Sequence, residues 1–194
     1  MTSARERAEA TPRSADQGGL AWFFGYGSLM WHPGFVHEAF EPARLDGFHR
    51  ALCIYSHHYR GTPARPGLVL GLAPGGACTG RAIGVAAARE PEVLAYLDAR
   101  ELLTSYVYER RLLPLELLGG GRQVRAWCYV ARSDHEQFAG GLDQAAMLGH
   151  VLHGHGAGGS NIAYVRNTVA HLREIGIREP ELERLAEQLP PEPD

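Results

Sequence analysis

The order of the predicted elements indicates an α+β fold. The first two thirds of the 194-residue chain hold extended apolar stretches separated by glycine and proline, and the last third has three segments of helical periodicity. One further helix interrupts the strands, so the pattern differs from the βα alternation of a parallel sheet. The length suits one domain with a real hydrophobic core. We therefore expect a single compact α+β domain over residues 20–189, a disordered leader over 1–19 and a tail over 190–194.

Residues 22–31, WFFGYGSLMW, contain the first strand and the most informative loop. The aromatic run from Trp22 to Phe24 favours a buried strand. Gly25 and Gly27 then end the strand in a tight loop around residues 26–29. The backbone N–H groups of such a loop can converge on an anion or a polarised carbonyl. An ordinary strand end with glycines for turning explains the same spacing equally well.

Further strands follow along the chain. Ala51 to Tyr55 is a buried extended stretch, and residues 57–67, rich in glycine and proline, form a loop. Glycines inside the next strands favour bends or close backbone approach, as in a small closed barrel. The expected strands are 68–76 running into a turn, 78–86, and a hairpin of 106–117 with 122–132. The glycines concerned are Gly71, Gly80 and Gly84.

Helical spacing marks four longer segments and one short one. Pro91 suits a first helical turn, and Ser160 or Asn161 suits an N-cap. Gly176 suits a helix end. The helices are expected at 90–103, 142–154, 160–176 and 180–189, with one short helical turn at 37–40.

Composition excludes several classes of function. The net charge is −3 with both signs scattered, so we expect no nucleic-acid partner and no membrane-binding basic run. All 19 basic residues are arginine, which excludes a Schiff-base lysine and a P-loop lysine. The three cysteines include no C-x-x-C pair, no apolar run could span a membrane, and the leader lacks the apolar region of a signal peptide. These features predict a soluble, cytoplasmic protein.

Several patterns carry possible chemistry. Asp98 and Glu101 share one face of the predicted helix, where they form either a solvated surface pair or, since leucines flank Glu101, a partly desolvated proton shuttle. GHGAGG, residues 154–159, matches the dinucleotide fingerprint by letter but follows a helix rather than a strand. Ser28 lacks the surroundings of a nucleophilic serine. Histidines that resemble metal ligands only in spacing lack a carboxylate or cysteine partner, which favours solvated histidines. These are His57, His58, His150, His153 and His155.

Several ordered motifs together resemble the γ-glutamylcyclotransferase superfamily, and specifically its ChaC-type branch acting on glutathione. The motifs are FGYGSLMW, GFHR, RGTPxRPGLVL, CTG, YLDARE and GGSNIAYV, spread from about Trp22 to Ile177. The resemblance implies a γ-glutamylcyclotransferase-like domain built on a small mixed β-barrel with flanking helices. It also implies the reaction glutathione → 5-oxoproline + cysteinylglycine, with no metal and no cofactor.

The resemblance also assigns site residues. The glutamate of LDARE, Glu101, corresponds to the family's catalytic acid/base. The sequence departs from the family at Ala163, where a glutamate is usual. Arg60 and Arg65 are candidates for the glycine carboxylate of glutathione. The loop expected to bind substrate is Tyr26, Gly27, Ser28, Leu29, Met30 and Trp31, with Tyr26 and Trp31 as pocket walls; Tyr129 and Tyr164 either face the site or pack in the core.

Two alternatives stay open from the sequence. One is a cyclotransferase for other γ-glutamyl amino acids or amines, and the other is a non-catalytic binding module of the same fold. The presence of Glu101 argues against the binding module. The oligomeric state is left open.

Overall fold

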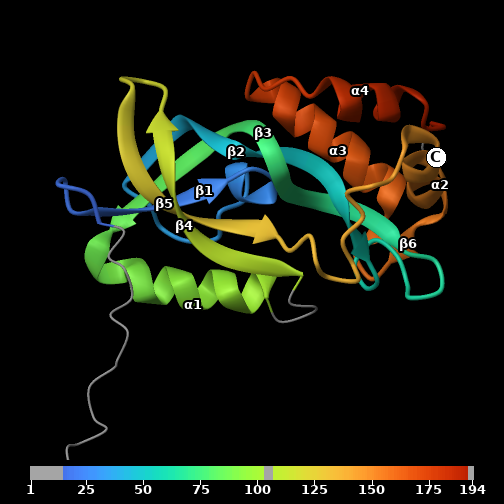
Figure 1. The fold of residues 1–194 in the computed structure, drawn as a ribbon, viewed down its shortest axis with the longest axis horizontal. Helices are drawn as coiled ribbons and strands as arrows, with labels where there is room; N and C mark the ends of the chain where they lie inside the picture. Colours follow the sequence, from blue (N-terminus) through green and yellow to red (C-terminus); the bar gives the residue numbers. More distant parts are fainter. Residues whose placement is uncertain (1–14, 103–106, 192–194) are drawn as a thin grey trace, which may run out of the picture.

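The long strands close into a mixed β-barrel (Figure 1). A computed structural model describes residues 15–102 and 107–191, and the barrel order within them is β1-β3-β2-β4-β5. Neighbouring strands are antiparallel except β1 and β5, which are parallel. The strands are β1 (Leu20–Gly25), β2 (Ala39–Ser56), β3 (Gly67–Ala86), β4 (Tyr108–Leu117) and β5 (Arg122–Ala131). The predicted α+β class and mixed barrel are confirmed.

The helices cover the barrel on two sides. Figure 1 shows α1 along one side, with α2, α3 and α4 grouped at the other. The helices are α1 (Glu90–Glu101), α2 (Gln144–His153), α3 (Asn161–Glu174) and α4 (Pro180–Glu187), with the short 3-10 helices η1 (Ser28–Met30) and η2 (Ala87–Arg89) and a two-stranded hairpin of β6 (His155–Gly156) and β7 (Gly159–Ser160). These positions confirm the four predicted longer helices. In the part of the chain described, no helix is long and apolar enough to cross a membrane.

Strand β1 is buried on both faces, which explains its run of aromatic residues. Successive side chains of a strand point to opposite faces. Trp22 and Phe24 therefore join the large core inside the barrel, which continues under α2, α3 and α4. Ala21 and Phe23 point the other way, into a second core formed with α1. The strand thus fixes both the barrel and the helix that carries Glu101.

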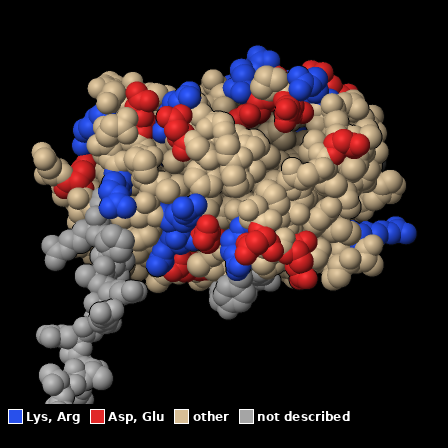
Figure 2. Space-filling model, in the orientation of Figure 1, with Lys and Arg blue, Asp and Glu red and all other residues tan. Residues whose placement is uncertain are grey.

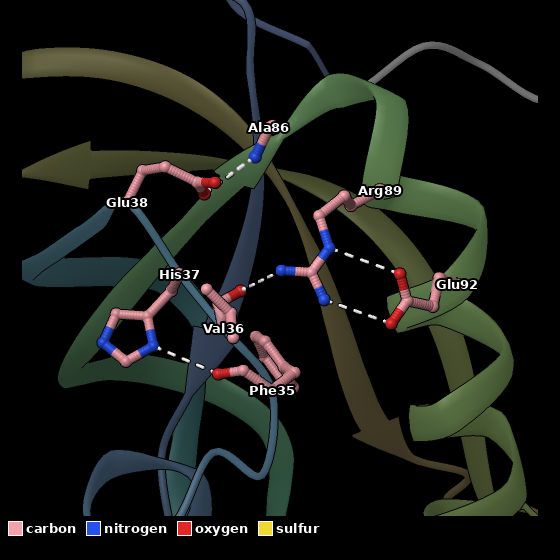
Figure 3. A network of polar contacts seen from close by, with 7 residues as sticks. All are labelled: Phe35, Val36, His37, Glu38, Ala86, Arg89 and Glu92. Carbon is pink, nitrogen blue, oxygen red and sulfur yellow. Dashed lines mark hydrogen bonds and ion pairs between the residues drawn. The ribbon is translucent and has the colours of Figure 1, made fainter.

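Helix α1 is anchored at its start by a polar network (Figure 3). The guanidinium of Arg89 pairs with the carboxylate of Glu92 at 3.1 Å and donates to the carbonyl of Val36 at 3.4 Å. The backbone N–H of Ala86 donates to Glu38 at 2.8 Å. Apolar side chains on one face of the helix, Val93, Leu94 and Leu97, are buried against the barrel. The helix axis is therefore fixed before it reaches Glu101.

Two local predictions are wrong. The turn expected after residue 74 is absent, because β3 continues without interruption through Gly75 and Gly76. Both glycines have positive φ and lie opposite Gly47 in an irregularity of the β2–β3 pairing, so the strand bends there instead of reversing. The helical turn expected at 37–40 is also absent, because β2 begins at Ala39.

The structure covers only part of the expected leader and tail. Residues 1–14 and 192–194 lie outside the described residues, and with them most of the expected leader and tail. Leu103, the last residue of the helix predicted over 90–103, lies outside them as well. Within the described part, Asp16 accepts hydrogen bonds from the indole N–H of Trp22 at 2.9 Å and from Arg122 at 2.8 Å. Contacts with the barrel therefore begin before residue 20.

Candidate active site

The loop after β1 is held by a buried arginine and by close backbone packing. The side chain of Arg50, on β2, has no exposed surface, and its Nε donates to the carbonyl of Tyr26 at 2.6 Å. Its Nη2 donates to the carbonyl of Thr79 at 2.7 Å, and its Nη1 pairs with Glu179. A Cβ at Gly80 would lie 2.3 Å from the carbonyl oxygen of Gly25, so glycine is required there. These contacts fix the course of the chain into η1.

A cavity of about 490 Å³ opens beside this loop. That volume lies within the usual range for sites that bind small molecules. Its walls come from the loop after β1, the segment 54–60, β3, the end of α1, β4, β5 and α3. Six tyrosines are among the lining residues: Tyr26, Tyr55, Tyr59, Tyr108, Tyr129 and Tyr164. The cavity therefore combines aromatic walls with hydroxyl groups.

Glu101, the last residue of α1, brings a carboxylate to the cavity wall. Its side chain is 23% exposed, and its Oε1 lies 3.2 Å from Nε of Arg100. Burial raises the pKa of Glu101 above its ordinary value, and the positive charge of Arg100 opposes that rise. A carboxyl group whose pKa is raised toward neutrality can both accept and return a proton.

Three phenols surround this carboxylate and stay neutral. Burial raises the pKa of Tyr26 and of Tyr108 well above the ordinary value, and raises that of Tyr164 to about 12. The nearby charge of Glu101 contributes to each rise. At neutral pH these hydroxyl groups can donate hydrogen bonds without carrying charge.

Asp98, which the sequence pairs with Glu101, has a different role. It accepts a hydrogen bond from the hydroxyl of Tyr129 at 2.6 Å and forms an ion pair with Arg110. Asp98 is not among the residues that line the cavity, whereas Glu101 is. The two carboxylates therefore lie in different environments, and of the two only Glu101 lines the cavity.

Side chains of α3 and β4 form hydrogen bonds to the backbone of β3 in the part of that strand that β1 does not pair with. The pairing of β1 with β3 ends at Gly25 and Arg81. Near the start of β3, the side-chain amide of Asn161 accepts a hydrogen bond from the N–H of Leu68 at 2.6 Å and donates one to the carbonyl of Leu68 at 2.7 Å. Two residues later, the N–H of Leu70 donates to the hydroxyl of Tyr164 at 3.0 Å, and the hydroxyl of Tyr108 donates to the carbonyl of Leu70 at 2.7 Å. Leu70 lines the cavity, so these bonds shape its floor.

The glycine-rich segment 154–159 holds the loop around residues 58–60 through backbone contacts. It forms the β6–β7 hairpin, whose Ala157 and Gly158 N–H groups donate to the carbonyls of residues 58 and 59 at 2.9 and 2.8 Å. A Cβ at Gly156 would lie 2.2 Å from the carbonyl oxygen of His58. The guanidinium of Arg60 donates to the carbonyl of Gly158 and stacks over the ring of Tyr164, 5.2 Å from its centre. The glycines therefore permit close backbone approach, and no βαβ unit surrounds them in the described residues.

The structure brings only some of the residues expected at the site together at the cavity. Tyr26, Gly27, Ser28 and Leu29 line the cavity together with Glu101, Arg60, Tyr129 and Tyr164. Met30 is buried in the barrel core, and Trp31 stacks on His171 with ring centres 4.6 Å apart. Neither is among the residues that line the cavity, so the structure does not bring Met30 and Trp31 together with the other residues expected at the site. Arg65 lies exposed in the turn it closes with Thr62, also away from the cavity.

The histidines make backbone contacts. Nδ1 of His150 lies 2.9 Å from the carbonyl of Pro66, and Nδ1 of His153 lies 2.9 Å from that of Gly149. Over residues 15–102 and 107–191, no group of three or more His, Cys, Asp or Glu side chains is placed to hold a metal ion.

Sequence reasoning missed the residues that hold the site together. Arg50 appears in the motif GFHR, but nothing local shows that it reaches Tyr26, 24 positions away. Asn161 was considered only as an N-cap, whereas Ser160 performs that role and accepts from the N–H of Ala163 at 3.0 Å. Arg100 lies within YLDARE, where the sequence suggests only surface pairing with the neighbouring carboxylates. No signal short of the fold identifies these contacts.

Comparison with known proteins identifies the relatives of this chain. The family model described as ChaC-like protein matches residues 21–190. A glutathione-specific γ-glutamylcyclotransferase of Escherichia coli is 30% identical over 182 residues, covering 92% of this chain and 78% of the relative. One from Schizosaccharomyces pombe is 30% identical over 175 residues, covering 81% and 85%. The crystal structure of a yeast γ-glutamylcyclotransferase specific to glutathione aligns with a TM-score of 0.76 at 23% identity, over 87% of this chain and 95% of that one, which shows a common fold.

Proposed function

This chain belongs to the ChaC-like protein family, and from that premise we propose that it is a glutathione-specific γ-glutamylcyclotransferase. The reaction converts glutathione into 5-oxoproline and cysteinylglycine. The observation that carries the proposal is the position of Glu101, whose half-buried carboxylate faces the same cavity as the loop 26–29.

The chemistry needs no nucleophile from the protein. The α-amine of the γ-glutamyl group attacks its own γ-carbonyl carbon, and a new C–N bond closes a five-membered lactam. The C–N bond to the cysteine nitrogen breaks. Counted from the ammonium form, the attacking nitrogen loses two protons as it becomes the lactam N–H, and the departing nitrogen gains two as it becomes an ammonium group, so no water and no electrons are consumed. Since both reacting groups belong to one molecule, the protein has only to hold the reactive conformer, stabilise the oxyanion and move the proton.

Glu101 is the proposed proton carrier. Its raised pKa suits removal of a proton from the ammonium group and delivery to the leaving amine, a role typically worth about 10²–10⁴-fold in rate. The backbone of Gly27, Ser28 and Leu29 is proposed to hold the glutamyl end and the oxyanion, with Tyr26 as a wall. No metal ion or cofactor takes part in this scheme.

Selectivity for the whole tripeptide is proposed to depend on Arg60. The far end of glutathione carries a glycine carboxylate, which requires a cationic or N–H partner. Arg60 lines the cavity and is held over Tyr164, whereas Arg65 does not line it. A charge-assisted hydrogen bond from Arg60 distinguishes glutathione from γ-glutamyl amino acids that lack the glycine.

Partner and location follow from the same features. Figure 2 shows acidic and basic side chains interspersed on the face in view, which supports a small-molecule substrate and no nucleic-acid partner. All three cysteines, Cys53, Cys78 and Cys128, are buried and free, which supports a reducing, cytoplasmic location.

The test is to incubate the purified protein with glutathione and to detect 5-oxoproline and cysteinylglycine by mass spectrometry. Glu101→Gln keeps the shape of the side chain but cannot exchange a proton at neutral pH, so we expect a loss of about 10²-fold or more. Glu181→Gln makes the same change at an exposed glutamate of α4 that does not line the cavity, and it should keep wild-type activity. Absence of both products from the wild type refutes the function, and more than roughly a tenth of the rate in Glu101→Gln refutes the role of Glu101.

A further inference from the structure

The guanidinium of Arg100 contacts the two walls of the cavity at once. Its Nε lies 3.2 Å from Oε1 of Glu101, and its Nη2 donates to the hydroxyl of Ser28 at 2.6 Å. Its Nη1 donates to the carbonyl of His32 at 3.2 Å. All three nitrogen atoms are therefore engaged, one by the carboxylate at the end of α1, one by the first residue of η1 and one by the chain just after η1.

This contact is unlike an ordinary surface ion pair. Adjacent residues of a helix do not face each other, so the pairing of Arg100 with Glu101 is not a product of helical spacing. The two side chains are only 25% and 23% exposed, and both residues line the cavity. A planar guanidinium directs its donors in fixed, different directions, which the ammonium of lysine cannot do. The geometry suits a rigid bridge between two elements that are far apart in sequence.

We propose that Arg100 is a positioning residue, which holds Glu101 and the loop 26–32 in a fixed relation at the cavity. This inference rests on the proposed function, because it assigns Glu101 and the loop to the same bound substrate. Arg100 acts through these partners, since a displacement of about 1 Å between reacting groups can cost about 10²-fold in rate.

The same bridge gives Arg100 an electrostatic effect on Glu101. Among the described residues, the ionisable groups that interact electrostatically with this carboxylate include the guanidinium of Arg100 and the neutral phenols of Tyr26 on the loop, Tyr108 on β4 and Tyr164 on α3. Among these, Arg100 supplies the positive charge that opposes the effect of burial on the pKa. Without that charge the carboxyl group holds its proton to higher pH.

The experiment compares Arg100→Met and Arg100→Lys with the wild type. The profile of kcat/KM against pH is measured for glutathione, and the carboxyl carbon of Glu101 is followed by NMR during a pH titration without substrate. We expect Arg100→Met to lower the plateau of kcat/KM by about 10²-fold and to move both the acidic limb of the profile and the NMR transition to higher pH. Arg100→Lys keeps the positive charge but lacks the planar set of donors. It should therefore return the acidic limb of the pH profile toward its wild-type position while the plateau of kcat/KM stays low.

The control is Arg44→Met, which removes an exposed arginine that is ion-paired with Asp46 and does not line the cavity. It should leave the plateau and the limb unchanged, and melting temperatures report any loss of folding. An unchanged NMR transition in Arg100→Met, an equal effect of Arg44→Met, or full recovery of the plateau in Arg100→Lys overturns the inference. If the wild type proves inactive on glutathione, the proposed function fails, while the NMR titration of Arg100→Met still decides whether Arg100 controls Glu101.

Discussion

Asn161 offers the sharpest test of how the cavity floor is built. Its side chain is completely buried and pairs with both backbone groups of Leu68, at 2.6 and 2.7 Å. Replacement by leucine keeps the number and branching of the side-chain heavy atoms but leaves one buried N–H and one buried carbonyl without a partner. Each unsatisfied group costs about 1–3 kcal/mol, so Asn161→Leu should lower the free energy of unfolding by about 2–6 kcal/mol. Domains have about 5–15 kcal/mol in total, so the loss would be large.

Urea denaturation measures this loss directly. With a slope of about 1–3 kcal/mol per M, the midpoint should fall by about 1 M or more while the slope stays unchanged. The matched control is Asn167→Leu, the same substitution on the exposed side of the same helix, for which we expect a change within about 0.5 kcal/mol. Equal midpoints for the two variants would refute the reasoning, because the pairing with Leu68 would then contribute nothing.

Three further predictions concern the site. Gly27→Val should reduce activity far more than melting temperature, because a Cβ there meets only Leu70, at 3.6 Å, and the added methyl groups enter the cavity; equal losses would indicate a structural role. Glu101→Gln should melt at a higher temperature than the wild type at neutral pH and lose that advantage in acid. The reason is that folding raises the pKa of Glu101. Protonated Glu101 therefore stabilises the folded wild type fully below the unfolded pKa, and this stabilisation disappears as pH rises through the folded pKa. An unchanged difference across pH would contradict this. Arg60→Ala should reduce the preference for glutathione over γ-glutamylcysteine by about 10- to 100-fold in kcat/KM, with Arg65→Ala as control, and equal use of both substrates by the wild type would contradict selectivity for the tripeptide.

Elements with local signals could be predicted from the sequence. Trp22 to Phe24 marks a strand, Pro91 with the apolar residues that follow it marks α1, and Ser160 caps α3. Each signal lies within one turn or one strand of the residue it specifies. Such elements form where local preference and the fold agree.

The bend at Gly75 and Gly76 could not be predicted, because a distant strand decides it. Proline followed by two glycines is a strong local signal for a turn. In the fold, β2 pairs along both halves of β3, and Gly47 lies opposite the two glycines. Long-range pairing therefore converts a turn sequence into a bent, continuous strand.

The residues that line the cavity were partly predictable from the sequence, whereas the contacts that support them were not. Resemblance pointed to Glu101 and the loop after β1, and four of the six loop residues line the cavity. Met30 and Trp31 differ because η1 turns the chain back into the core directly after Leu29. A sequence motif runs continuously through such a turn, whereas only part of the turn faces the cavity.

Arginine side chains hold the loops near the cavity in place by donating hydrogen bonds to their backbone carbonyls. Loop carbonyls lack the partners that helices and sheets supply, and each one that is buried needs a donor. Arg50 donates to Tyr26 and Arg100 to His32, both in the loop 26–32, and Arg60 donates to Gly158 in the β6–β7 hairpin, so each of these two segments has a guanidinium on its backbone. A guanidinium can donate to a carbonyl and still pair with a carboxylate or stack on a ring, whereas an ammonium is a single point charge. A chain with 19 arginines and no lysine thus has the side chain best suited to this task.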